Sequence, residues 1–159
     1  MNKGSKGFSL IELLIVVAII LIIAAIAIPN LLRSRIAANQ ASAVGSLRTL
    51  NTAEITYSST YNSGFSATLT YLQPGTTQTP TASTAGLIDS VLASGSKSGY
   101  SFTYSAGSVD SAGRIDNYAI TAVPINSSTG TNYYYTDQSG VIRQNSTTTA
   151  TSNDSPLAG

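Results

Sequence analysis

Residues 7–30 of the chain read GFSLIELLIVVAIILIIAAIAIPN, and the long apolar run within them is its most informative feature. The run from Leu13 to Ile28 holds 16 apolar residues, and Phe8, Leu10 and Ile11 extend it to about 20 positions. A helix of about 20 apolar residues spans a hydrocarbon core of about 30 Å. We therefore predict a transmembrane helix near the N-terminus.

The charges on the two sides of this run give conflicting signals on orientation. Lys3 and Lys6 precede it, which favours a cytoplasmic N-terminus and places the rest of the chain outside the cytoplasm. Arg33 and Arg35 follow it and argue for the opposite orientation. We expect the first arrangement.

An ordinary secretory signal peptide is an alternative interpretation of the same segment. Ala24, Ala25 and Ala27 could supply the small-residue cleavage site that follows the apolar core of such a peptide. The length of the apolar run and the carboxylate at its start, Glu12, both argue against this alternative.

Glu12 is the only acidic residue in or near the apolar run. An acidic side chain at the centre of a membrane helix costs about 2.5 to 3.5 kcal/mol on insertion scales, so such a residue usually has a partner or a function. The alternative is that Glu12 has no function and is a carboxylate tolerated near the membrane surface. The position of Glu12 therefore favours a functional role.

The stretch from Gly7 to Glu12 (GFSLIE), behind a short basic leader, resembles the class III signal of type IV prepilins and type II secretion pseudopilins. The resemblance implies a prepilin peptidase that cleaves between Gly7 and Phe8 and methylates the new N-terminus of Phe8. It divides the chain into a leader (residues 1–7), a transmembrane and polymerisation helix (residues 8–30) and a periplasmic or extracellular head (residues 31–159). It also implies that Glu12 neutralises the N-terminus of a neighbouring subunit in a filament.

Pro29 lies directly after the apolar run. Its ring crowds the carbonyl of Ala25 and it lacks an N–H, so a helix that continues through it should kink or locally melt. The alternative is that Pro29 simply ends the membrane helix. Resemblance to the pilin family favours a kink within one long helix.

Beyond Pro29 the pattern becomes amphipathic, and we expect a single helix from Phe8 to about Thr60. The C-terminal half of its apolar stripe is expected to face the core of the head. The apolar residues that recur at helical spacing are Leu32, Ile36, Val44, Leu47, Leu50 and Ile55. The residues expected on other faces are Arg33, Arg35, Asn39, Gln40, Arg48 and Asn51.

The remaining residues predict a small head with one sheet. We expect a helical turn at residues 67–72 within a loop, and a short helix at residues 84–93 that buries Leu87, Ile88, Val91 and Leu92. Strands are predicted at residues 99–105 and 117–123, and a hairpin should pair residues 132–136 with 141–143. The tail from residue 144 is expected to be irregular. The predicted fold class is α+β, with the long helix packed on an antiparallel sheet as in pilins.

Composition excludes several classes of function. Charged residues make up 9% of the chain and its net charge is +1, so it lacks the basic face that nucleic-acid binding requires. Histidine and cysteine are absent, which removes the commonest general base and metal ligands. The acidic residues of the head are scattered rather than spaced as in a calcium loop. We predict neither an enzyme nor a metal or cofactor site.

The prediction is a structural subunit of a type IV pilus that serves adhesion or motility. Its expected partners are copies of itself, the prepilin peptidase, the membrane and the inner-membrane machinery of a pilus or type II secretion system. The chain should reside in the inner membrane before assembly and in an extracellular filament afterwards. The alternatives are a type II secretion pseudopilin and a membrane-tethered binding module that does not polymerise.

Overall fold

The computed structural model describes residues 7–76 and 79–157. It divides into two compact units, one up to Arg35 and one from Ile36, and each is described by itself. Helix α1 (Leu10–Tyr61) contributes to both. Its bounds confirm the predicted long helix within two residues at each end, and its passage through Pro29 rules out the alternative that Pro29 ends it.

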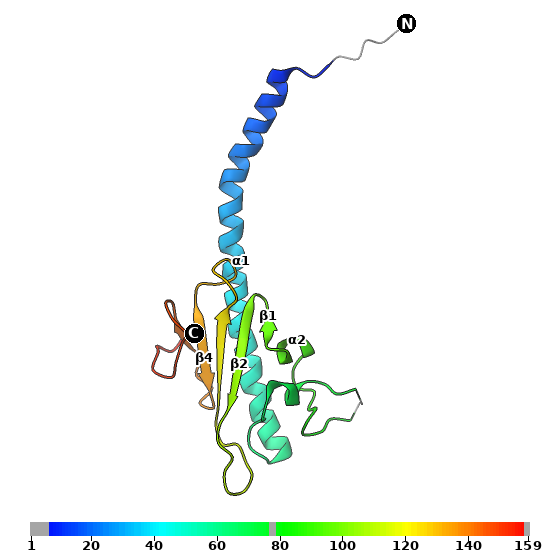
Figure 1. Cartoon of the computed structure of the whole chain (residues 1–159), viewed down its shortest axis with the longest axis vertical. Helices are drawn as coiled ribbons and strands as arrows, with labels where there is room; N and C mark the ends of the chain where they lie inside the picture. Colours follow the sequence, from blue (N-terminus) through cyan, green and yellow to red (C-terminus); the bar gives the residue numbers. More distant parts are fainter. Residues whose placement is uncertain (1–6, 77–78, 158–159) are drawn as a thin grey trace. The chain divides into compact units, whose positions relative to one another are not determined.

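The second unit contains one five-stranded antiparallel sheet, whose strands follow each other in chain order (Figure 1). The strands are β1 (Ser96–Lys97), β2 (Tyr100–Ala106), β3 (Tyr118–Pro124), β4 (Tyr133–Asp137) and β5 (Arg143–Asn145). The longest pairing joins β2 to β3, from Tyr100 opposite Pro124 to Ala106 opposite Tyr118. With α1 this sheet confirms the predicted α+β class.

Strand alternation places one face of the sheet against the core. Along β3 the side chains of Tyr118, Ile120 and Ala122 are buried, and the residues between them are partly exposed. Tyr100 and Phe102 of β2 are buried in the same alternating pattern. A one-residue slip would turn these side chains to the solvent, so the period of two fixes the register.

The head half of α1 presents a buried stripe to this core. The stripe consists of Ala43, Ser46, Leu47, Leu50, Asn51, Ala53, Glu54 and Tyr57, which recur every three or four residues. The core is completed by residues outside the sheet, among them Leu69 and Leu72 of the 3₁₀ helix η1 (Leu69–Leu72) and Leu92 of α2 (Ser90–Ala93).

The predicted apolar stripe on α1 was partly wrong. Leu47 and Leu50 are buried as expected, whereas Ile55 is 59% exposed. Asn51, which was expected on another face, is only 7% exposed. The small residues Ala43 and Ala53 define the buried face, and Ile55 lies about 100° around the helix from buried Glu54.

The short helix of the head is much shorter than predicted. Helix α2 comprises only Ser90–Ala93, because the residues before it bond to the end of η1 instead: Ala85 N–H donates to the Tyr71 carbonyl at 2.8 Å and Leu87 N–H to that of Leu72 at 2.7 Å. Gly86 lies between them at φ +68°, which is outside the α-helical range. Asp89 caps α2 by accepting from Leu92 N–H at 2.8 Å. Val91, predicted to be buried, is 56% exposed.

The C-terminal part of the sheet also differs from the prediction. Strand β5 begins at Arg143 rather than Val141, because a turn with Gly140 at φ +74° follows β4. The tail is not wholly irregular, since Gln144 N–H donates to the Ser155 carbonyl at 3.1 Å and Leu157 N–H to that of Ile142 at 2.8 Å. The short strand β1 was not predicted at all.

Candidate functional site

Ser9 and Glu12 form a capped start of α1. The Ser9 carbonyl accepts from Leu13 N–H at 3.2 Å, which makes Ser9 the residue that precedes the helix. Glu12 reaches back, and its Oε2 accepts from Ser9 N–H at 2.9 Å. A Ser followed three residues later by a Glu that bonds back in this way is the carboxylate half of a capping box. Glu12 is therefore oriented toward the N-terminal end of the helix, where a carboxylate also interacts favourably with the helix dipole.

Gly7 and Phe8 precede the helix and belong to no helix or strand. Phe8 is 77% exposed, and an added Cβ at Gly7 would meet no atom within 4 Å. The peptide bond between them is thus sterically accessible in the chain itself. The basic leader residues Lys3 and Lys6 lie outside the described residues.

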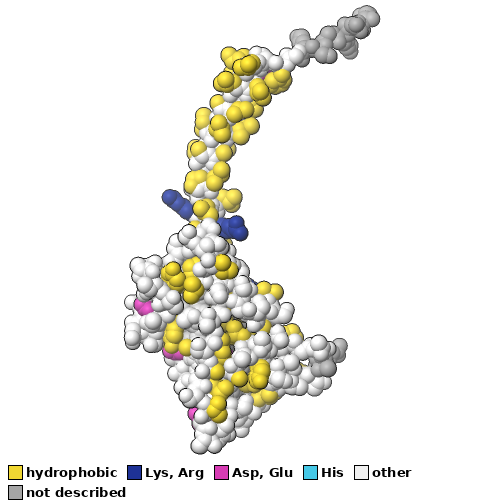
Figure 2. All heavy atoms as spheres, viewed as in Figure 1, with side chains coloured by type: hydrophobic (Ala, Val, Ile, Leu, Met, Phe, Trp, Pro, Cys, Tyr) yellow, Lys and Arg dark blue, Asp and Glu magenta, His cyan; other side chains and the backbone are white. Residues whose placement is uncertain are grey.

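The N-terminal half of α1 exposes an almost continuous apolar surface (Figure 2). Each large apolar residue from Phe8 to Leu32 is at least 43% exposed, whereas those of the head are mostly buried. This part of α1 is long and apolar enough to cross a membrane. An apolar surface of this extent requires lipid or a protein partner.

Pro29 lies inside α1 without ending it. It cannot donate to the Ala25 carbonyl, so one hydrogen bond of the helix is missing at this point. One turn further on, Ser34 Oγ donates to the Asn30 carbonyl at 3.0 Å. Ser34 lies between Arg33 and Arg35, beyond the apolar run, and this back-bond satisfies its hydroxyl within the helix.

Comparison with known proteins identifies a motif in this N-terminal segment. Residues 2–28 match the family model of the prokaryotic N-terminal methylation motif. The segment therefore carries a prokaryotic N-terminal methylation motif. The chain is 51% identical over 53 residues to the type IV major pilin protein PilA of Myxococcus xanthus, which is 33% of this chain and 24% of that protein. It is 65% identical over 37 residues to the type IV wide pilus major component PilA4 of Thermus thermophilus, which is 23% of this chain and 28% of that protein.

These matches with type IV pilins are confined to part of each protein. The chain matches about a quarter of the length of either pilin. No solved structure matches it significantly. The resemblance noted at GFSLIE is thus confirmed for the N-terminal motif. The function of the head has to be argued from its own contacts.

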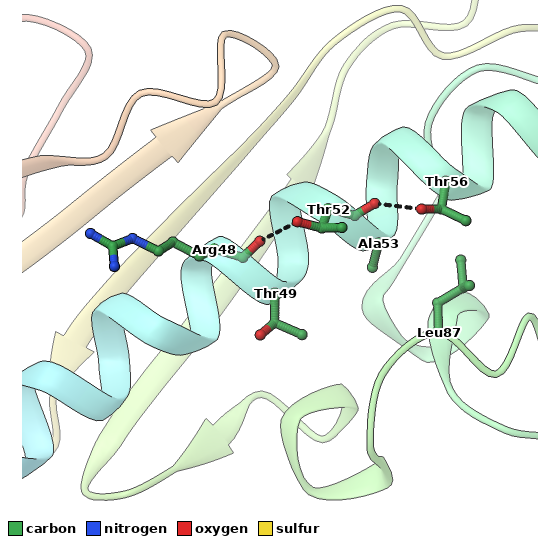
Figure 3. A pocket seen from close by; sticks show the side chains of 6 residues that line it. All are labelled: Arg48, Thr49, Thr52, Ala53, Thr56 and Leu87. Carbon is green, nitrogen blue, oxygen red and sulfur yellow. Dashed lines mark hydrogen bonds between the residues drawn. The ribbon is translucent and has the colours of Figure 1, made fainter.

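The head has a shallow surface depression of about 330 Å³ beside α1 (Figure 3). It is lined by Arg48, Thr49, Thr52, Ala53 and Thr56 of α1 and by Leu87. The hydroxyls of Thr52 and Thr56 donate to the carbonyls of Arg48 and Thr52, at 3.0 and 2.8 Å. These hydroxyls are committed to the helix, so the depression presents methyl groups rather than a nucleophile next to a base.

Most acidic residues of the head have local structural partners. Asp110 forms an ion pair with Arg114 at 3.1 Å and also accepts from backbone N–H groups of its own turn, which lower its pKa. Asp89 caps α2 and forms an ion pair with Lys97 at 2.8 Å, and the Lys97 hydrogen bond lowers its pKa. Among the described residues, no group of three or more acidic side chains is placed to hold a metal ion.

Proposed function

We propose that the chain is the precursor of a type IV pilus subunit that polymerises through the N-terminal half of α1. The observation that carries this proposal is the exposed apolar surface of residues 8–32, with one carboxylate oriented at its start. The methylation motif over residues 2–28 supports the same assignment. The head then serves as the solvent-facing body of each subunit.

Cleavage between Gly7 and Phe8 creates the charge that assembly uses. The new Phe8 ammonium lies about four residues, or about 6 Å of helical rise, from Glu12 in the same apolar layer. A charge in such surroundings is costly unless it is paired. In a filament the Glu12 carboxylate of one subunit neutralises the ammonium of its neighbour, and this pairing sets their axial register.

The proposal implies a defined set of partners. A prepilin peptidase processes and methylates Phe8, inner-membrane machinery of a pilus system adds the subunits, and further copies of the chain complete the filament. The product is an extracellular filament for adhesion or motility, and the subunit has no catalytic role. Pro29 provides a point at which the packed helix bends or extends.

A type II secretion pseudopilin is the nearest alternative, because it would carry the same motif. The names of the matched relatives, a major pilin and a wide-pilus major component, favour a pilus. Expression in a host with a type IV pilus system separates the two: we expect long surface filaments that contain this chain, whereas a pseudopilin would give none at ordinary expression.

Mass spectrometry of material sheared from the cell surface tests the processing step. We expect a mature N-terminus at Phe8 with one methyl group. An intact Met1 or a cut after Ala27 would overturn the proposal. Electron microscopy of the same material then distinguishes a filament from a membrane-tethered head that does not polymerise.

A further inference from the structure

Glu54 is a completely buried acid in the head of the protein. Its side chain lies on the buried stripe of α1 and is 0% exposed. Both carboxylate oxygens meet one residue: Ser66 N–H donates to Oε2 at 2.9 Å, and Ser66 Oγ lies 2.6 Å from Oε1. Glu54 thereby attaches the segment that follows α1, residues 62–72, to the helix.

A count of protons around Ser66 indicates the state of this acid. Ser66 Oγ carries one proton but lies within hydrogen-bond distance of three oxygens: Glu54 Oε1 at 2.6 Å, the Thr68 carbonyl at 3.1 Å and Tyr104 Oη at 3.4 Å. Tyr104 supplies no proton to Ser66 Oγ, because its hydroxyl donates to the Ser66 carbonyl at 2.7 Å. An ionised Glu54 would take the only proton of Ser66 Oγ. A neutral Glu54 would instead donate its own proton from Oε1 to Ser66 Oγ. The Ser66 hydroxyl proton would then be free for the Thr68 carbonyl, so the 2.6 Å and the 3.1 Å contacts would both be hydrogen bonds.

The surroundings also disfavour a charge on Glu54. The titratable groups that face it are tyrosines: Tyr57 from α1, Tyr104 from β2 and Tyr118 from β3. The two ion pairs among the described residues, Lys97–Asp89 and Arg114–Asp110, do not involve it. Burial raises the pKa of Glu54, and the hydrogen bonds from Ser66 offset this only in part.

We propose that Glu54 is a neutral carboxylic acid in the folded head at neutral pH, and that its ionisation at higher pH releases residues 62–72 from α1. The carboxylic acid acts as a donor to Ser66 and an acceptor from it, which a carboxylate cannot do. Loss of the proton places an unpaired charge beside three tyrosines, and water must enter to solvate it. Residues 62–72 must move to admit this water, because Ser66 holds them against Glu54.

The direction of the pH effect follows from linkage. A group with a raised pKa in the folded state binds its proton more tightly there than in the unfolded chain. The contribution of Glu54 is therefore complete below its ordinary pKa of 4.5 and is lost as the pH rises through its folded-state pKa. Burial also raises the pKa values of Tyr57, Tyr104 and Tyr118, so these tyrosines remain neutral in that range.

Carbon-13 NMR of the full chain in detergent micelles tests the proposal, because the chain has only two glutamates, Glu12 and Glu54. With Glu12→Gln used to assign the signals, we expect the Glu54 Cδ signal at the position of a protonated carboxyl at pH 7. Raising the pH should move it to the ionised position. Over the same range, the amides of residues 62–72 should lose at least tenfold of their protection from hydrogen exchange.

Glu54→Gln is the matched control, because its amide can donate to Ser66 Oγ and accept from Ser66 N–H but does not titrate. Its protection at residues 62–72 should not change with pH once intrinsic exchange rates are corrected for. An ionised Glu54 signal at pH 7 in the unmodified chain would overturn the proposal, even if this variant fails to fold. Equal release in the variant and the unmodified chain would overturn the coupling.

Discussion

The Tyr118 hydroxyl donates a hydrogen bond of 3.0 Å to Oδ1 of Asn51 and so joins β3 to the buried stripe of α1. The Asn51 Nδ2 in turn donates to Thr136 Oγ1 at 2.9 Å and to the Gly140 carbonyl at 3.3 Å. Both ends of this buried amide are thus satisfied. A rotation of α1 by one residue would leave all three partners unpaired, so the network fixes which face of the helix meets the sheet.

Replacement of Asn51 should therefore destabilise the head strongly. We expect Asn51→Ala to lower the free energy of unfolding by about 2 to 4 kcal/mol, because two buried hydroxyls lose a partner and a small cavity remains. Urea denaturation of the full chain in detergent, followed by the near-ultraviolet circular dichroism of its tyrosines, measures this. Thr52→Ala, at the exposed next position, should change the value by no more than about 0.5 kcal/mol. Similar losses in both variants would contradict the role of the network.

The same network shows why the buried polar residues of the core could not be predicted from the sequence. Strands β2, β3 and β4 and the long helix were predictable because their side chains repeat with periods of two and 3.6. Asn51 and Glu54 were not predicted to be buried, because polar residues on a helix usually face solvent. Their partners lie 67 positions away at Tyr118 and 12 positions away at Ser66. Only the folded arrangement brings these groups together.

The N-terminal segment, residues 7–28, was easier to interpret from the sequence because its informative residues are close together along the chain. The apolar run and the GFSLIE stretch lie within 22 successive residues, from Gly7 to Ile28. The cap of α1 was missed, although Ser9 and Glu12 have the spacing of a capping box before an apolar helix. The proposed cleavage and methylation would depend on another protein, so the fold of this chain alone does not encode their outcome.

The two roles of Glu12, as a helix cap and as a charge, can be separated by substitution. Glutamine also serves at this position of a capping box, so Glu12→Gln should keep the start of α1 and the membrane insertion of the precursor. It should nevertheless reduce surface filaments severely or abolish them, because the Phe8 ammonium loses its counter-charge. Immunoblots of sheared and membrane fractions measure both outcomes.

Glu12→Val provides the matched comparison because it removes the cap and the charge together. Both variants should insert into the membrane and fail to assemble. Normal filaments from both would refute any role of Glu12 in assembly. Normal filaments from Glu12→Gln alone would assign the role to the cap and not to the charge.

Gly130 and Gly45 should respond in opposite directions to the same substitution. A Cβ at Gly130 would lie 2.2 Å from Tyr100 Oη and 2.7 Å from its Cζ, and the Tyr100 ring is fully buried. Gly130→Ala should therefore destabilise the head by about 1 to 3 kcal/mol. Gly45 lies within α1 with no atom within 4 Å of an added Cβ, so Gly45→Ala should stabilise the chain by up to about 1 kcal/mol. Thermal unfolding in detergent measures both, and a stabilising Gly130→Ala would contradict the packing at Tyr100.

Asp154 holds the C-terminal loop, residues 145–157, closed by hydrogen bonds. Its Oδ2 accepts from Thr151 N–H at 2.7 Å and its Oδ1 from Asn145 Nδ2 at 2.7 Å. The Thr151 N–H bond, followed by the Asn145 and Thr151 side chains, lowers the Asp154 pKa below its ordinary 3.8. The contribution of this carboxylate is therefore present above pH 3.8 and is lost as the pH falls through the lower folded-state pKa.

Acid should thus open this loop in the unmodified chain, and Asp154→Ala should open it at every pH. We expect the amides of residues 145–157 to lose protection from hydrogen exchange below pH 3.8, while those of β2 and β3 keep theirs. Asp116→Ala removes an exposed acid between β2 and β3, so the loop should stay closed in that variant at neutral pH. A loop that is equally protected in Asp154→Ala and in the unmodified chain would show that backbone pairing near Gln144 and Leu157 closes it without the carboxylate.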